Sequence, residues 1–250
     1  MTCEIDVNTP LGQLAAEHPH WLPIFDRFGL DYCCHGSRTL LAACESAGVH
    51  AEDVLGAICE VRPTAGAIEE REWLTASMTE LADHIEATHH ARARDTFTRL
   101  ATLVPRVQSA HAERHPWLVD LRRTIESLAE AMHDHMVREE RVLFPWLRRL
   151  DRPSEIHTGP PWSVKRPISC MVHDHDEVAE MLGEIKGLTS GYATPPEACG
   201  SFRTMIELLR QLDEDTRRHI HKENNILFPA GVQAEQAHAR QAPFATDKAV

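Results

Sequence analysis

The chain has 250 residues and a formal net charge of −12, a length that allows one large or two modest domains with a buried core. The acidic balance leaves no basic stripe for a phosphate backbone. No run of about 18 or more apolar residues offers a membrane-spanning helix. We therefore expect neither nucleic acid nor a membrane as a partner.

The cysteines and histidines are unevenly used. Seven cysteines are scattered along the chain, apart from the adjacent pair Cys33 and Cys34, and the first residues lack the basic start and apolar stretch of a secretory signal. An odd number of cysteines without such a signal favours free thiols in a reducing compartment, so we expect a cytoplasmic protein. The 17 histidines are compatible either with solvated side chains or with metal binding.

A small helical N-terminal domain is predicted over residues 1–62. Short amphipathic helices are expected at residues 10–14, 21–28, 39–46 and 51–60. The motif Asp-Tyr-Cys-Cys-His-Gly occupies residues 31–36, between the second and third helices. A linker is expected over residues 63–74, where proline and glycine interrupt the helical pattern.

Residues 75–234 are predicted to form four long helices. The first begins at the capping box Ser77-Met-Thr-Glu80 and ends before Pro105. The other three are expected at about residues 116–150, 168–188 and 194–229. Because β-branched runs and alternating patterns are scarce, the fold class is all-α, and an up-down-up-down four-helix bundle is the simplest packing. We expect residues 235–250 to form a flexible tail.

One motif occurs twice within the predicted bundle, as HMVREERVLFP from His135 and HIHKENNILFP from His219. Each copy places a histidine and a glutamate at i, i+4, one above the other on a helix: His135 with Glu139, and His219 with Glu223. The residues seven positions before and after each histidine, such as Val142, are apolar. Buried imidazoles and carboxylates are costly unless they are paired or bind metal. A single copy would be typical of a surface, but two copies in register predict a metal site.

The first and third helices supply further histidines. A strict repeat register would pair His89 with His173, whereas apolar neighbours at +7 and +10 favour His90 with His175. The predicted metal-ligand set contains three residues from each half of the bundle: His90, His135, Glu139, His175, His219 and Glu223. We expect Asp83, His84 and Asp174 either to orient these ligands or to lie as polar groups at the bundle ends.

Four imidazoles and two carboxylates suit a pair of borderline metal ions, most naturally iron, with the glutamates bridging. A lone zinc ion usually takes about four ligands and would leave part of the set unused. Occupancy by zinc or manganese stays open.

Five motifs stand in order along residues 8–230: PLGQLA, DYCCHG, HDHDEVAEML, TPPEAC and HIHKENNILFP. The bundle resembles hemerythrin-like (HHE) di-iron domains. With DYCCHG ahead of it, the chain resembles the Repair of Iron Centres (RIC) family of YtfE/ScdA type. The resemblance implies the same six ligands and two iron ions per chain (Fe2+/Fe3+), oxo- or hydroxo-bridged when oxidised.

The resemblance also implies a task. Such a cytoplasmic protein restores iron-sulfur clusters damaged by nitrosative or oxidative stress, and its clients are damaged or apo iron-sulfur proteins. Iron donation and reduction of nitric oxide are the two implied mechanisms. The alternatives are a sensor or carrier that binds O2 or NO, or an enzyme such as an NO reductase or peroxidase acting on NO or peroxide. Oxygen carriers of the hemerythrin type use an additional histidine, for which His84 or His111 is the candidate.

The thiol motif departs from the family pattern at His35, where the resembling family usually has glycine. Adjacent cysteines are poorly placed to bridge each other, so Cys33 and Cys34 are candidate redox thiols. His35 either has only a local role in the loop or places an imidazole beside the thiols, lowering a pKa or adding a metal ligand. The N-terminal domain is expected to form a homodimer, contact a client or relay electrons.

Overall fold

The computed structural model describes residues 5–61, 72–152 and 163–241. Regular structure within these ranges is helical and includes no β-strand, which confirms the all-α class. None of the helices in the described ranges is long and apolar enough to cross a membrane.

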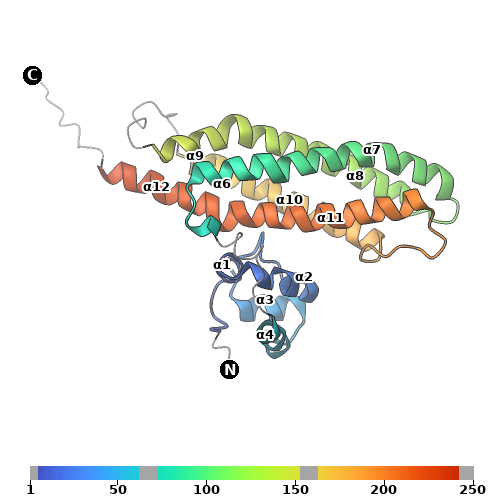
Figure 1. The fold of residues 1–250 in the computed structure, drawn as a ribbon, viewed down its shortest axis with the longest axis horizontal. Helices are drawn as coiled ribbons and strands as arrows, with labels where there is room; N and C mark the ends of the chain where they lie inside the picture. The colour runs from blue at the N-terminus through green and yellow to red at the C-terminus, as the bar shows by residue number, and fades with distance from the viewer. Residues whose placement is uncertain (1–4, 62–71, 153–162, 242–250) are drawn as a thin grey trace, which may run out of the picture.

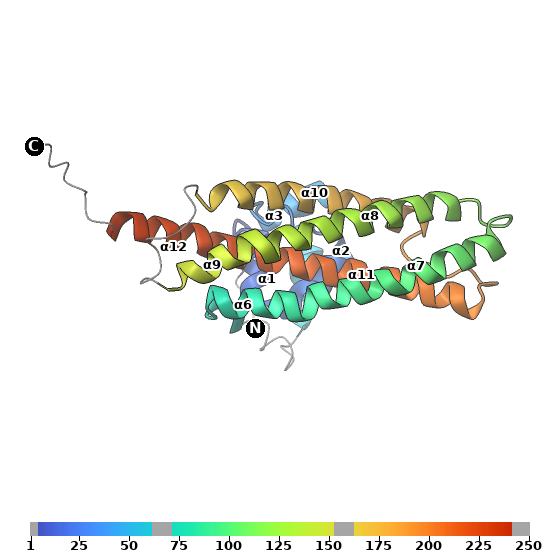
Figure 2. The same cartoon turned by 90° about the horizontal axis from the view of Figure 1, so that it is seen from above.

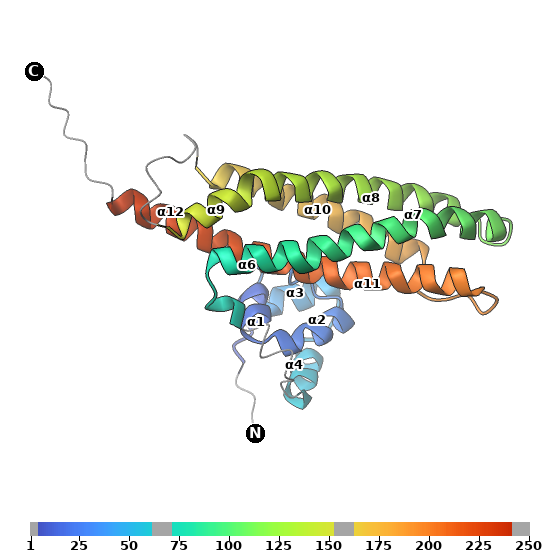
Figure 3. The same ribbon diagram turned by 45° about the horizontal axis from the view of Figure 1, so that its top comes forward.

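Four short helices form the N-terminal domain: α1 (Leu11–Glu17), α2 (Leu22–Phe28), α3 (Leu40–Ala47) and α4 (Ala51–Glu60). Gly29 and Gly48 end α2 and α3 in the left-handed conformation, which costs glycine little. Buried side chains such as Leu11 and Phe25 form the domain's core. The domain lies against the side of the long bundle, below α6 and α11 in the views of Figures 1 and 3.

Four long helical rods form the bundle, and each rod runs antiparallel to the one before it in the chain (Figure 2). The first comprises α6 (Met78–His84), η3 (Ile85–His90) and α7 (Ala91–His111); the second comprises α8 (Leu118–Arg138), η4 (Glu139–Leu143) and α9 (Phe144–Leu150). The third is α10 (Lys165–Leu188); the fourth comprises α11 (Gly200–Lys222), η6 (Glu223–Leu227) and α12 (Phe228–Gln241). The segments η3, η4 and η6 are single π-helical turns, a form that is rare in proteins and frequent at functional sites.

The structure corrects two predicted helix ends and the predicted burial of one side chain. We expected the first helix to end before Pro105, but α7 continues through this proline to His111. The fourth rod continues past Pro229 to Gln241, which includes part of the predicted tail; residues 242–250 lie outside the described ranges. Pro229 is the second residue of α12, a first-turn position that tolerates proline. Val142 is 48% exposed rather than core-facing, because the extra residue of the π turn η4 rotates the helix register.

The predicted ligands lie between two apolar layers. On one side of the ligands along the bundle axis, residues of every rod belong to an apolar cluster that continues into the N-terminal domain. Met132 and Val178 are examples. On the other side of the ligands, residues of every rod belong to a second apolar cluster, which includes Phe144 and Phe228. The capping box at Ser77 forms as predicted and starts α6. The polar site is therefore closed by apolar packing along the bundle axis.

Candidate metal centre

All six predicted side chains meet in the middle of the bundle, and each is at most 1% exposed. Their donor atoms form two groups, within which all atoms lie within 4.8 Å of one another. One group contains His90 and His219, the other His135 and His175, and both contain Glu139 and Glu223. We call these the His90/His219 position and the His135/His175 position.

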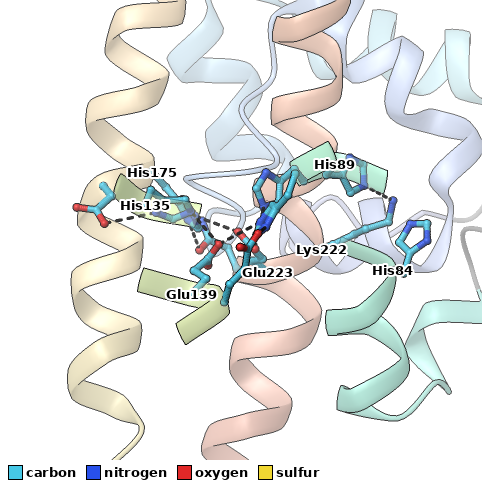
Figure 4. A network of polar contacts seen from close by, with 12 residues as sticks. His84, His89, His135, Glu139, His175, Lys222 and Glu223 are labelled. Atoms are coloured by element: carbon cyan, nitrogen blue, oxygen red, sulfur yellow. Dashed lines mark hydrogen bonds and ion pairs between the residues drawn. The ribbon is translucent and has the colours of Figure 1, made fainter. Parts of the chain in front are cut away.

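Each glutamate faces both positions (Figure 4). The Oε2 atom of Glu139 lies 3.2 Å from His135 Nε2 and 3.4 Å from His90 Nε2. Glu223 uses one oxygen for each position, with Oε1 2.9 Å from His219 Nε2 and Oε2 3.0 Å from His175 Nε2. Carboxylates shared in this way have the geometry of bridging ligands.

The outer nitrogens of three histidines are held by oxygen acceptors. The Nδ1 atom of His90 lies 2.7 Å from Glu140 Oε1, and that of His135 lies 3.4 Å from Asp174 Oδ2. The Nδ1 atom of His175 lies 2.9 Å from the amide oxygen of Asn224. Since these oxygens accept, each Nδ1 donates a hydrogen bond outward, which leaves Nε2 as the nitrogen that faces the interior of the site.

The inward donors fit cations. His90 Nε2 and His219 Nε2 are 3.2 Å apart, and His135 Nε2 and His175 Nε2 are 3.3 Å apart. Both oxygens of Glu139 and Oε2 of Glu223 are buried without a hydrogen-bond partner in the described structure. Buried imidazole nitrogens and unpartnered carboxylate oxygens that converge in this way are costly unless a cation lies between them. Imidazole and carboxylate donors suit iron, manganese or zinc.

The electrostatics of the site differ between the two positions. Burial lowers the pKa of a histidine, but at His135 the carboxylates of Glu139 and Asp174 outweigh burial and raise the pKa to about 10. At His219, burial prevails over Glu223 and lowers the pKa to about 4. Burial raises the pKa of both ligand glutamates, but their imidazole neighbours outweigh it and hold both pKa values below the ordinary range. Both carboxylates are therefore ionised at neutral pH although they are buried inside the bundle.

The alternative histidines lie elsewhere. His173 is 74% exposed and pairs with Glu177 on the surface of α10. His89 is buried, but its Nδ1 lies 3.1 Å from Asp215 and its Nε2 accepts from Lys222 Nζ at 3.1 Å (Figure 4). His89 therefore packs behind the ligands, its ring parallel to that of His219 with centroids 5.5 Å apart.

The two candidates for an additional ligand, His84 and His111, also lie outside the two groups of donors. His84 packs its ring on Trp73, with centroids 4.1 Å apart. His111 lies at the far end of α7, where its Nε2 is 3.3 Å from Cys199 Sγ. The position of neither residue supports the additional ligand of an oxygen carrier.

Two of the predicted supporting residues differ in their positions: Asp174 holds His135, whereas Asp83 pairs with Arg148 away from the six donors. Three further neighbours of the site were not predicted: Glu140, Asn224 and the buried Lys222. Glu140 and Asn224 directly follow the ligand glutamates, so their place in the repeat was an available signal. Nothing in the sequence distinguishes a lysine that is 2% exposed from one in solvent.

The thiols of the DYCCHG loop lie close to the bundle. The Sγ atoms of Cys33 and Cys34 are 3.7 Å apart and both thiols are free. His35 directs Nδ1 to Asp31 Oδ2 at 2.5 Å, and Cys33 Sγ donates to the other Asp31 oxygen. The hydrogen bond with Cys34 and burial raise the pKa of Cys33 well above its ordinary value. The Asp31, Cys33 and Cys34 donor atoms form a third close group.

Comparison with known proteins agrees with this architecture. Residues 81–231 match the family model of the hemerythrin HHE cation binding domain, and residues 7–62 match ScdA_N, a domain of unknown function. "Iron-sulfur cluster repair protein YtfE" of Escherichia coli O157:H7 is 32% identical over 228 residues, which are 91% of this chain and 98% of that protein. Proteins of the same name from E. coli O81 (strain ED1a) and from Escherichia fergusonii are 33% identical over the same shares.

These matches confirm the resemblance seen in the sequence, and the bundle is a di-iron-binding fold of the hemerythrin type. With an HHE domain over more than half its length and relatives above 30% identity along nearly all of it, the chain belongs to the Repair of Iron Centres family of hemerythrin-like proteins.

Proposed function

We propose that this chain binds two iron ions through His90, His135, Glu139, His175, His219 and Glu223 and repairs iron-sulfur clusters damaged by nitrosative or oxidative stress. The observation that carries the proposal is the pair of buried donor groups that share two glutamates. The names of relatives that match over 91% of the chain support the repair task.

The donor set suits a protein that releases its metal. Iron bound only by imidazole and carboxylate cycles between Fe2+ and Fe3+ and is held less tightly than iron in thiolate or haem sites. The residues of the chain hold the two positions together through Glu139 and Glu223, keep the imidazoles in the binding tautomer and exclude bulk water by burial. Donation of iron to a damaged cluster is therefore the mechanism that we favour over reduction of NO.

The partners in this proposal are damaged or apo iron-sulfur proteins. Six cysteines of the described chain are free, which supports action in the reducing cytoplasm. The proposal also includes a homodimer through the N-terminal domain, which carries the exposed apolar side chains Leu41 and Val61. Light scattering of the purified protein measures this dimer directly.

The test is restoration of a damaged cluster. A purified [4Fe–4S] enzyme is inactivated with NO and incubated with the ferrous protein, a thiol reductant and a sulfide source. We expect activity to return with the wild type and not with the Glu139→Ala variant, and the iron content of the wild type to fall as activity returns. Steady turnover of NO or peroxide without any recovery of the client would replace repair with an NO reductase or peroxidase function.

A further inference from the structure

Two asparagines connect the candidate metal centre to the thiol loop of the N-terminal domain. Asn224 and Asn225 directly follow the ligand Glu223 in the π turn η6. Asn224 Nδ2 donates to the backbone oxygen of Cys33 at 3.0 Å, and Asn225 Nδ2 donates to the backbone oxygen of Tyr32 at 3.1 Å. The loop is therefore docked on the turn that carries a metal ligand.

The docking is sterically specific at two glycines. A Cβ atom on Gly12 would lie 2.1 Å from Asn225 Oδ1, and one on Gly36 would lie 2.3 Å from the same atom. The two glycines also join each other, since the Gly12 amide donates to the Gly36 oxygen at 2.8 Å. This close approach explains why the last position of the DYCCHG motif needs a glycine. Any larger residue at Gly12 forces Asn225 to move.

Asn224 transmits the loop's position to a metal ligand. The Cys33 carbonyl can only accept a hydrogen bond, so the amide of Asn224 must turn Nδ2 toward it and Oδ1 the other way. Oδ1 lies 2.9 Å from His175 Nδ1, which must then donate. Nε2 of His175, which lies 3.0 Å from Glu223 Oε2, is then the nitrogen that faces the metal position. A backbone carbonyl of one domain thus selects the tautomer of a histidine in the other.

The matching histidines do not depend on the N-terminal domain in this way. His90 and His135 donate to the carboxylates of Glu140 and Asp174, which accept in any orientation. An amide that loses its partner can instead rotate and present Nδ2 to His175. That rotation would favour the tautomer with the proton on Nε2, which cannot bind a metal through this inward-facing nitrogen. The Cys34 thiol also contacts the backbone oxygen of His175 at 3.8 Å.

We propose that Asn224 is a positioning residue that couples the docked thiol loop to His175, so that metal at the His135/His175 position is released when the loop leaves the bundle. This inference rests on the proposed function, because it assigns different roles to the two iron positions. Loss of a partner that orients a metal-bound histidine typically lowers metal affinity by about 10- to 100-fold. The same factor is expected here for one iron of the pair.

The experiment measures release of Fe2+ to a chelator from the full chain. In Asn224→Leu and in Gly12→Ala we expect one of the two irons to leave about tenfold or more faster, and the other at the wild-type rate. Gly56→Ala is the matched control, since a Cβ there meets no atom within 4 Å. In Asn224→Asp the carboxylate accepts from His175 whatever the loop does, so adding Gly12→Ala should have no further effect.

A second readout needs no iron. Nitrogen-15 NMR of the metal-free protein reports the tautomer of His175, which we expect to be Nδ1–H in the wild type and mixed in Asn224→Leu and Gly12→Ala. Wild-type protein that fails to hold two irons would overturn the proposed function but would leave this tautomer result standing. Unchanged tautomer populations together with wild-type release rates in both variants would overturn the coupling.

Discussion

The two metal positions have nearly identical donors but different surroundings. The His90/His219 position is enclosed by charged residues of the bundle alone: Glu140 pairs with Arg94, and His89 lies between Asp215 and Lys222. At the His135/His175 position, Asp174 with Arg138 supports His135, whereas His175 is supported by Asn224, which also binds the N-terminal loop. A repeated motif can therefore supply the same donor types to both positions. The packing around them differs, so that one position is supported by bundle residues and the other depends also on a second domain.

The shared glutamates provide the test with the largest expected effect. Replacing Glu139 or Glu223 by alanine removes a donor from both positions at once, so bound iron should fall from two per chain toward none. Iron analysis after reconstitution measures this loss. The control is Glu177→Ala, which removes an exposed carboxylate that pairs with His173 on the surface of α10. Two irons retained in both glutamate variants would disprove the assignment of the site.

Single-histidine variants should separate the two positions. His219→Ala removes a donor only from the His90/His219 position, and His175→Ala only from the other, so each should keep about one iron per chain. Mössbauer spectra of the oxidised variants would show isolated rather than coupled ferric ions. If either variant lost both irons, the positions would depend on each other more strongly than their separate donor sets indicate. His173→Ala serves as the surface control on the same helix.

Removal of the Glu140 carboxylate should weaken metal binding only at the His90/His219 position. Glu140→Leu deprives His90 of the acceptor that orients it, and we expect metal affinity at the His90/His219 position to fall by about 10- to 100-fold. Glu140→Gln keeps an acceptor and should cost less. Competition titration with a chelator measures both, and Glu130→Leu on the exposed face of α8 is the control. If Glu140→Leu instead weakened metal binding at the His135/His175 position, the proposed difference between the two positions would be wrong.

The smallest effect concerns the thiols beside the His135/His175 position. Because Cys34 and burial raise the pKa of Cys33 well above its ordinary value, its thiolate fraction is small at neutral pH and rises only at strongly alkaline pH. Alkylation of Cys33 near pH 8 should therefore be much slower than that of the exposed Cys170. Peptide mass spectrometry distinguishes the two sites. In Gly12→Ala the undocked loop should expose Cys33, so that its alkylation rate approaches that of Cys170. Equal alkylation rates of Cys33 and Cys170 in the wild type would contradict a docked loop.

Local sequence rules were sufficient for much of the bundle. The capping box placed the start of α6 at Ser77, and the repeated i, i+4 spacing placed His135 with Glu139 on one helix face. Apolar neighbours distinguished His175 from His173, which the structure leaves 74% exposed. The rules failed at Pro105 and Val142, where continuation through a proline and a π turn changed the helix end and the register.

The sequence by itself determined the all-α class, the doubled motif and the six side chains that converge, because helical periodicity and burial are encoded within one or two turns. Only the tertiary structure decided which distant parts of the chain the neighbours of these six residues contact. Asn224 meets the Cys33 carbonyl 191 positions away, and Lys222 meets His89 133 positions away. Such contacts depend on how separate elements pack, so no local pattern records them. The difference between the two metal positions arises at this level.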